Sequence, residues 1–194
     1  MSPSSERLAI VLASGSPRRR ELLAQLGLIY EAEAPNVDET PLSGESPIDY
    51  VGRVALAKAN AIADADALVI AADTTVEVEG EIIAKPIDFA DARAMLRRLS
   101  GRTHEVHTGV ALRRGDRCVT ATVTSQVTFV ALSDEVIDWY VATGEPLDKA
   151  GAYAIQGAGA VLVESVEGSV SNIIGLPLHT VVALAAKLGV TLLK

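Results

Sequence analysis

The segment Leu8–Gly27 constrains the fold more than any other part of the sequence. Its first part, Leu8–Ala13, is a short apolar run with β-branched residues that leads into a Ser-Gly-Ser turn, which is typical of a buried strand. Pro17 suits a first helical position, and the leucines after it keep helical spacing until Gly27. The pattern predicts a strand that passes through Ser14–Arg19 directly into a helix.

The rest of the chain continues this alternation of strands and helices. Ser46 and Pro47 begin a capping box that opens a helix reaching about residue 63. Other patterns predict helices at 88–99, 133–142 and 177–189, an exposed loop at 34–45, a buried strand at 67–72 that ends on Asp73, and hairpins at 74–84, at 104–130 and around Glu167-Gly168. Since tight turns join several neighbouring strands, we expect an α/β fold with a mixed sheet and flanking helices.

The chain has 194 residues, enough to bury a core, and shows no internal repeat and no linker. We therefore expect one domain over residues 1–194, with two lobes around a cleft remaining possible. Basic side chains number 17 and acidic ones 25, and this excess of acid argues against a long nucleic acid as partner. Aromatic residues make up only 4% of the chain, too few for stacking platforms on single strands.

One cysteine, Cys118, excludes an internal disulfide and any zinc site of several cysteines, so a reducing cytoplasmic location is expected. The first apolar run is short and leads into three arginines, which favours a strand over a signal peptide. Pro177, His179 and Lys187 interrupt the apolar stretch 173–190, so it makes a poor membrane span. No membrane association is predicted.

The turn between the first strand and helix is a candidate phosphate site. Free backbone N–H groups at a helix start favour an anion, Ser14 and Ser16 add hydroxyl donors, and the forks of Arg18 and Arg19 match phosphate oxygens. The alternative is that these arginines are merely solvated. Cations oppose the helix dipole at this end, so three arginines together are easier to explain if an anion lies among them.

Acidic residues elsewhere suggest a metal. Asp73 follows an apolar strand, where ligands of open α/β sheets tend to bind, and Asp38 and Glu39 can complete an oxygen-rich site for Mg²⁺ or Mn²⁺. Lys58 and Lys85 can neutralise a polyphosphate. Taken one at a time, each has an ordinary alternative: Asp73 caps a turn, and the others are solvated surface residues.

Three further patterns are set aside. His104 and His107 are three apart in a predicted strand and should face opposite sides, so they do not share a metal. The sequence Gly157-Ala158-Gly159 lacks the third glycine and the helix of a dinucleotide fingerprint and is interpreted as a turn entering a strand. Cys118 is expected in the core, and no Gly-x-Ser-x-Gly elbow exists, so covalent catalysis has no candidate nucleophile.

Taken in order, a series of motifs resembles the Maf family of nucleoside triphosphate pyrophosphatases nearly from end to end. They are LASGSPRRRELLAQLG at 12–27, Val37-Asp38-Glu39, the helix with Lys58, AADTTV at 71–76, Lys85-Pro86, LSGRTHEVHTGVAL at 99–112, GEPLDKAGAYAIQG at 144–157 and SNIIGLPL at 171–178. The resemblance implies a twisted mixed sheet in two lobes around a substrate cleft, as in Maf and ITPase-like folds. It also implies hydrolysis of a nucleoside triphosphate to the monophosphate and pyrophosphate, and a homodimer.

Within the family, three segments mark the branch that acts on dTTP and UTP. This sequence carries Arg18-Arg19, Asp73-Thr74 and Ile155-Gln156-Gly157, which side with that branch over the one preferring 7-methyl-GTP. Ala154 stands where the family often has Gly, and its methyl group is expected to narrow the base pocket. An alternative of another class is a nucleotide-binding regulator of cell division with little turnover, since the family also bears an older label as septum-formation inhibitors.

These features combine into a hypothesis for the site. Ser14, Ser16, Arg18, Arg19, Lys58 and Lys85 hold the triphosphate, while Glu39 and Asp73 bind Mg²⁺ or Mn²⁺. Asp73 also activates the water that attacks the α-phosphorus. Thr74 and Gln156, with Arg19, select the pyrimidine, because buried hydrogen bonds discriminate bases better than apolar shape does.

Overall fold

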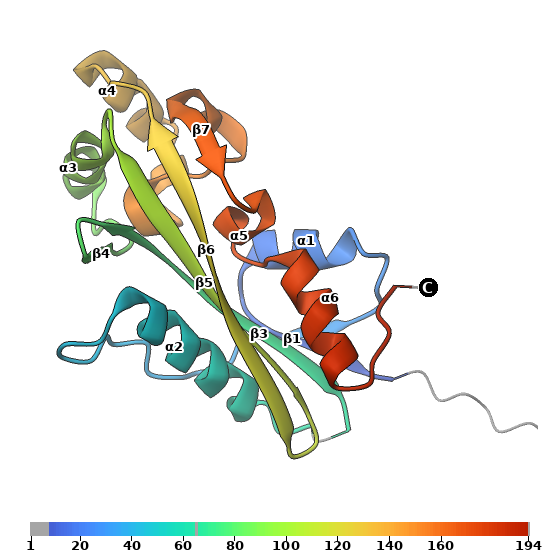
Figure 1. The fold of residues 1–194 in the computed structure, drawn as a ribbon. Coiled ribbons are helices and arrows are strands. Elements are labelled where there is room, and N and C mark those ends of the chain that lie inside the picture. Colours follow the sequence, from blue (N-terminus) through green and yellow to red (C-terminus); the bar gives the residue numbers. More distant parts are fainter. Residues whose placement is uncertain (1–7, 65, 194) are drawn as a thin grey trace, which may run out of the picture.

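The computed structural model describes residues 8–64 and 66–193. Its central element is a mixed β-sheet with three long strands (Figure 1). Its strands are β1 (Ile10–Ala13), β2 (Glu31–Glu33), β3 (Leu68–Val78), β4 (Glu81–Ile83), β5 (Thr103–Arg114), β6 (Arg117–Phe129) and β7 (Val163–Glu167). The α-helices are α1 (Pro17–Ala24), α2 (Pro47–Ala61), α3 (Phe89–Leu99), α4 (Asp134–Ala142), α5 (Val170–Ile174) and α6 (Leu178–Lys187). Three 3₁₀ helices, η1 (Glu145–Asp148), η2 (Ala150–Ala152) and η3 (Gly157–Leu162), lie between α4 and β7.

The sheet is mixed, as the sequence predicts. Its strand order is β2-β1-β3-β5-β6-β7, with β4 paired to β3 as well. Strand β1 runs parallel to β2 and β3, and every other pairing is antiparallel. The chain therefore combines two strand-helix-strand crossovers, through α1 and α2, with hairpins joined by tight turns, which confirms the α/β class.

Local sequence signals set where the helices begin. Ser16, Ser46 and Ser133 each accept a hydrogen bond from the backbone N–H three residues later, and so cap α1, α2 and α4. Pro17 and Pro47 occupy the first helical positions, where their missing N–H groups leave no hydrogen bond unmade. These starts confirm the predicted helices.

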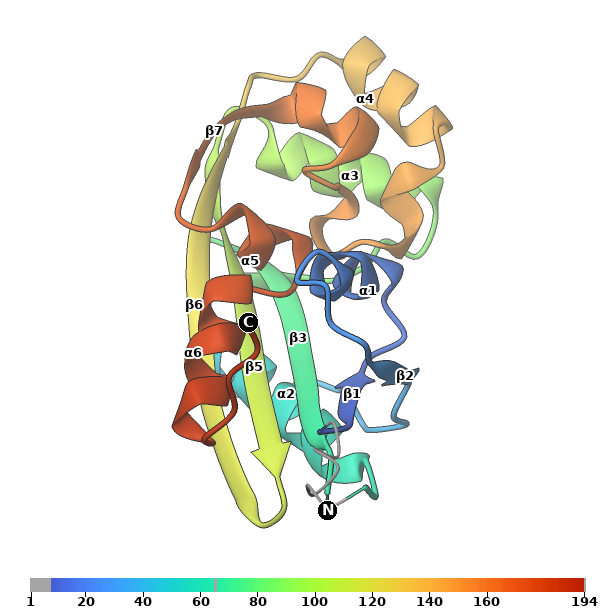
Figure 2. The same ribbon diagram turned by 90° about the vertical axis from the view of Figure 1, so that its right-hand side faces the viewer.

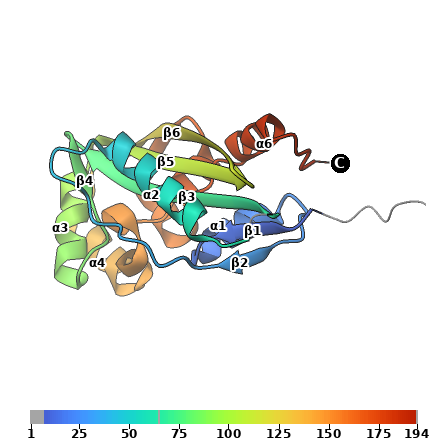
Figure 3. The same ribbon diagram turned by 90° about the horizontal axis from the view of Figure 1, so that it is seen from below.

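Two hydrophobic cores share one face of the long strands β3, β5 and β6. One core packs α1 and α6 against Leu68, Ile70 and Leu112, and the other packs α3 and α4 against Val76 and Phe129. Figures 2 and 3 show α3 and α4 at one end of the strands and α6 toward the other. The two cores are the physical basis of two lobes, because a polar band formed by Thr74 and Thr108 lies between them on that face.

Helix α2 covers the opposite face of the sheet (Figure 1). Its small residues Ala55 and Ala59 pack on Val69 and Ala71 of β3. The backbone of α2 also lies close to β5, because a Cβ added to Gly109 would lie 2.2 Å from the carbonyl oxygen of Val51. The missing side chain of this glycine therefore allows the helix backbone to reach the sheet.

Two predictions about strand ends are wrong. Asp73 does not end a strand: it lies within β3, which pairs with β5 from Val69 to Glu77, while β1 pairs with it only as far as Ala71. Asp73 thus lies just beyond the carboxyl end of its parallel neighbour. The chain makes no hairpin at Glu167-Gly168, because Ser169 caps α5 there and ends the strand.

The prediction that Cys118 lies in the core is also wrong. Cys118 is exposed near the tip of the β5-β6 hairpin, where the long strands extend beyond the core, and partial burial raises its pKa above the ordinary value of a thiol. The turn at Gly157-Ala158-Gly159 differs from its prediction in one respect, since it winds into the 3₁₀ helix η3 before the chain enters β7.

Candidate active site

A cleft of about 730 Å³ opens beside the middle of β3, within the usual size range of ligand sites. Every residue that the sequence hypothesis assigns to phosphate, metal or base lines this cleft: Ser14, Ser16, Arg18, Arg19, Glu39, Lys58, Asp73, Thr74, Lys85 and Gln156. These residues come from separate parts of the chain, and the fold brings them to one place.

The turn after β1 presents the start of α1 to the cleft. Ser14 Oγ accepts from the Ser16 N–H at 3.2 Å, and Ser16 Oγ accepts from the Arg19 N–H at 3.5 Å. Arg18 is half-buried at the wall of the cleft, whereas Arg20 is exposed and does not line it. The arrangement places backbone N–H groups and one guanidinium where an anion can bind.

Arg19 is buried in the wall of the cleft, with 9% of its surface exposed. Its guanidinium donates to the Gly175 carbonyl at 2.7 Å, to Thr74 Oγ1 at 2.9 Å and to Ser14 Oγ at 3.3 Å. Burial lowers the pKa of Arg19, while Asp73 and Glu39 oppose the shift. Because three of its five N–H groups are held by the protein, Arg19 braces the wall and has two left for a ligand.

The hydroxyl of Thr74 belongs to a chain of hydrogen bonds in the polar band. Thr108 donates its only hydroxyl hydrogen to the Asn172 carbonyl at 3.0 Å, so the 2.9 Å contact between Thr74 and Thr108 uses the hydrogen of Thr74. Since Thr74 also accepts from Arg19, it can meet a ligand only as an acceptor. Sequence alone does not give this direction.

Lys58 links the two carboxylates predicted to bind metal. Its Nζ lies 2.7 Å from Asp73 Oδ1 and 2.8 Å from Glu39 Oε1. Asp73 is 6% exposed, and burial raises its pKa above the ordinary value although Lys58 and Arg19 act in the opposite direction. Both carboxylates can therefore contact a single cation at once, a role that the ammonium group of Lys58 fills in this structure.

Comparison with known proteins gives the family. The sequence model of a family described as "Maf-like protein" matches residues 9–188. The chain belongs to the Maf family. A dTTP/UTP pyrophosphatase of Myxococcus xanthus (strain DK1622) is 53% identical to it over 191 residues, with 97% of each chain covered. A dTTP/UTP pyrophosphatase of Anaeromyxobacter dehalogenans (strain 2CP-1 / ATCC BAA-258) is 56% identical over 184 residues, covering 93% of this chain and 94% of that one.

A solved structure is also similar in part. The Staphylococcus aureus Ham1 protein aligns with a TM-score of 0.45 at 20% identity, covering 62% of this Maf protein and 71% of that chain. The family assignment does not depend on this similarity. Among the helices that the structure describes, none combines the length and apolar character needed to cross a membrane.

Sequence reasoning missed several residues that line the cleft of this Maf protein, among them Tyr50, Asp148, Lys149 and Tyr153. Lys149 Nζ lies 2.5 Å from Asp148 Oδ1 and donates to the Glu145 carbonyl at 2.6 Å. The segment 144–157 contributes to the resemblance, but nothing in its local pattern indicates that its lysine faces the site. Lys149 adds a cation at the rim of the cleft.

A second group of possible metal ligands lies outside the residues that line the cleft. Glu77, Glu105 and His107 place their ligand atoms within 4.8 Å of one another, so they are suited to a divalent cation. His107 Nε2 lies 2.8 Å from Glu77 Oε2, and its Nδ1 contacts Thr124 Oγ1 at 2.8 Å. An ion pair or hydrogen bond between His107 and Glu77 explains the same geometry without a metal.

His104 faces the other side of the sheet from His107, as its spacing predicts. Its Nε2 lies 2.8 Å from the hydroxyl of Tyr153, and its Nδ1 has no hydrogen-bond partner among the described residues. Burial lowers the pKa of His104 from 6.5 to about 4. His104 is therefore neutral at pH 7 and holds the aromatic side chain of a cleft residue.

This burial predicts a pH-dependent stability. Between pH 6.5 and about 4 the unfolded chain binds a proton at His104 that the folded chain excludes, so acid favours unfolding. Over that window the free energy of unfolding should fall by on the order of 3 kcal/mol from this group. Denaturant unfolding of His104→Gln across the same pH range should show a correspondingly weaker acid dependence than the unsubstituted protein shows.

The matched control is His179→Gln, because His179 is exposed. This variant should keep the acid dependence of the unsubstituted protein. Equal pH dependence in His104→Gln and His179→Gln would show that His104 does not lose its proton on folding.

Proposed function

We propose that this Maf protein hydrolyses dTTP and UTP to the nucleoside monophosphate and pyrophosphate. The observation that carries the proposal is the carboxylate pair Asp73 and Glu39, joined by Lys58, inside a cleft lined with further cations. A cleft built only to bind a polyanion has little use for two carboxylates beside the phosphates. The relatives named dTTP/UTP pyrophosphatase, at 53% and 56% identity over almost the whole chain, support the same reaction.

Cations around the cleft suit the triphosphate. Arg18, Lys85 and Lys149 line it together with the start of α1. Guanidinium and ammonium groups form charge-assisted hydrogen bonds with phosphate oxygens and stabilise charge that develops on the leaving pyrophosphate. In the same cleft, Gln156 and the acceptor oxygen of Thr74 offer polar partners for the pyrimidine edge.

Asp73 and Glu39 fit a divalent metal, because both carboxylates contact one cation, the ammonium of Lys58. Oxygen ligands of this kind suit Mg²⁺ or Mn²⁺. When bound there, such an ion would supply charge neutralisation for the triphosphate. Lys58 then has to leave the space between the carboxylates, and we propose that it turns to the phosphates.

The chemical step needs one proton acceptor. The oxygen of a water molecule attacks the α-phosphorus while Asp73 accepts a proton from it. The bond from the α-phosphorus to the bridging oxygen breaks, and the electron pair leaves with pyrophosphate. The raised pKa of Asp73 moves this carboxylate toward the range in which a general base is effective.

A substrate panel tests the proposal. Purified protein is incubated with Mg²⁺ or Mn²⁺ and dTTP, UTP, CTP, GTP or 7-methyl-GTP, and pyrophosphate and phosphate release are both followed. We expect pyrophosphate to be released faster from dTTP and UTP than from the other three nucleotides. No pyrophosphate should be released after the metal is chelated with EDTA. Restored activity on adding back Mg²⁺ would separate metal removal from protein damage.

Other outcomes assign other functions. A preference for 7-methyl-GTP would place the chain in the other branch, and phosphate in place of pyrophosphate would move the cleavage site. If nucleotide binds but no pyrophosphate is released with either metal, the alternative of a nucleotide-binding regulator with little turnover is favoured. The homodimer and the cytoplasmic location stay predictions; size-exclusion chromatography with light scattering checks the first of them.

A further inference from the structure

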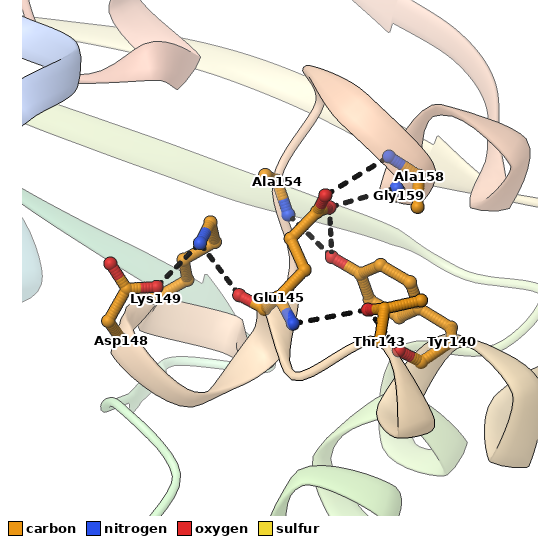
Figure 4. Close-up of polar contacts among 8 residues, drawn as sticks. All are labelled: Tyr140, Thr143, Glu145, Asp148, Lys149, Ala154, Ala158 and Gly159. Atoms are coloured by element: carbon orange, nitrogen blue, oxygen red, sulfur yellow. Dashed lines mark hydrogen bonds and ion pairs between the residues drawn. The ribbon is translucent and has the colours of Figure 1, made fainter.

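Gln156 stands on a loop that is wrapped around a carboxylate from another segment. Its own side chain is exposed and has no hydrogen-bond partner within residues 8–64 and 66–193. The backbone on both sides of it is fixed instead by Glu145 of η1 and Tyr140 of α4 (Figure 4). The placement of this base-reading residue therefore depends on groups other than itself.

Among residues 8–64 and 66–193, the Glu145 side chain forms its hydrogen bonds with this loop and with Tyr140. Oε1 accepts from the Tyr140 hydroxyl at 2.8 Å and from the Gly159 N–H at 3.0 Å, and Oε2 accepts from the Ala158 N–H at 3.1 Å. The Tyr140 hydroxyl in turn accepts from the Ala154 N–H at 3.1 Å. One carboxylate and one phenol thus hold the loop at both of its ends.

Two glycines show independently how tightly the loop is wound. A Cβ added to Gly157 would lie 2.5 Å from Glu145 Oε2, and the φ of this residue is +79°. A Cβ added to Gly159 would lie 2.2 Å from the Ala154 carbonyl oxygen and 2.7 Å from the Tyr140 hydroxyl. Only a backbone without side chains can approach the carboxylate and the phenol this closely at these positions.

The carboxylate is held in its charged form. Burial opposes ionisation of Glu145, but hydrogen bonds from Tyr140, Gly159 and Ala158 outweigh it and lower its pKa below the ordinary value. An ionised carboxylate accepts at both oxygens, and it has no hydrogen with which to repel the two N–H groups. A neutral amide of the same shape cannot replace it.

We infer that Glu145, together with Tyr140, is a positioning residue for pyrimidine selection, acting through Gln156. This inference rests on the proposed function, in which Gln156 reads the base. Glu145 itself is the anchor of the loop and touches no substrate in this scheme. Small displacements of a group that reads a base by hydrogen bonds weaken discrimination more than they weaken binding of the phosphates.

The test compares UTP with CTP, which differ at the base edge alone. Glu145→Gln keeps the shape but points an amide NH₂ at an N–H of Ala158 or Gly159. We expect the ratio of kcat/KM for UTP over CTP to fall about tenfold. Gln156→Ala should lower it by a similar factor, and Glu145→Gln should add no further loss of selectivity in the Gln156→Ala background.

A stability control separates positioning from damage. Leu96 is fully buried in the core that also holds Tyr140, so Leu96→Ala should lower the Tm while leaving the UTP/CTP ratio unchanged. Should Glu145→Gln fail to fold, Tyr140→Phe removes the hydroxyl that contacts both Glu145 and Ala154. It should then show the same loss of selectivity and the same dependence on Gln156.

The outcomes are distinguishable. Equal losses for UTP and CTP in Glu145→Gln, or an undiminished selectivity loss in the Gln156→Ala background, would overturn the inference. If the unsubstituted protein releases no pyrophosphate, the proposed function fails instead. The role of Glu145 is then tested by the ratio of the Kd values for UTP and CTP, measured by calorimetry with Mg²⁺ on the same variants.

Discussion

Asp73→Asn should reduce kcat for UTP on the order of 10²-fold or more while nucleotide still binds. The amide keeps the volume of the carboxylate, yet it neither accepts the proton of the attacking water nor carries the charge that attracts a metal. Lys58 would keep Glu39 as its partner, at 2.8 Å, so the wall of the cleft should persist. Steady-state kinetics of pyrophosphate release, with Kd measured by calorimetry, gives both quantities.

Asp148→Asn is the matched control for this substitution. Asp148 also lines the cleft, but its side chain is 71% exposed and forms an ion pair with Lys149, at 2.5 Å. Its substitution should change kcat by less than about threefold, because exposed ion pairs contribute little. Near-normal turnover in Asp73→Asn would remove Asp73 from the role of general base, whatever the control shows.

Gly109→Ala should destabilise the protein strongly, although it adds only one methyl group. The new Cβ would lie 2.2 Å from the Val51 carbonyl oxygen and 2.7 Å from the Gly52 nitrogen, both in the backbone of α2. A backbone cannot rotate out of the way, so α2 has to move off the sheet. Overpacking of this kind typically destabilises by about 1–3 kcal/mol, and we expect at least the upper value.

Activity should fall with stability in Gly109→Ala. Gly109 pairs directly with Asp73 across β3 and β5, and α2 carries Lys58. Displacing the helix therefore also disturbs the contact between Lys58 and Asp73. Denaturant unfolding and kcat are measured on the same preparation.

Gly52→Ala, at a glycine that lies beside Gly109, should change stability in the opposite direction. It lies within α2, and a Cβ there would meet only Thr122 Oγ1, at 3.6 Å, which is an ordinary contact. Since alanine is the better helix former, this variant should be more stable by about 0.5–1 kcal/mol. Equal stabilities for Gly109→Ala and Gly52→Ala would mean that α2 can shift without loss.

Local signals predict most elements of this fold. Capping serines, prolines at first helical positions and short apolar runs act within a few residues of one another, so the sequence displays them directly. The error at Asp73 arises because a distant partner decides: strand β3 continues through Asp73, since β5 pairs with it along almost its whole length. The error after β7 has a local cause, because the chain enters a helix that Ser169 caps.

The candidate site divides in the same way. Most of its cations and carboxylates, though not Lys149 and Asp148, were predicted from the sequence, since their residue types, order and spacing follow the Maf pattern. The hydrogen-bond partners that hold the site residues in place were not predicted. Arg19 is engaged by Gly175, and Glu145 holds a loop up to 14 residues away.

By itself, the sequence determined the α/β class, the starts of the helices other than α5 and most of the charged groups of the cleft, because each depends on residues close together in the chain or on a motif that carries them. Only the tertiary structure decided that Lys58 joins Asp73 to Glu39 and that Thr74 can meet a ligand only as a hydrogen-bond acceptor. It also decided that Glu145 anchors the loop of Gln156. Those contacts join segments that no periodicity relates. Their geometry is set by the packing of α2, β3 and η1, where a hydrogen bond needs its two atoms about 3 Å apart.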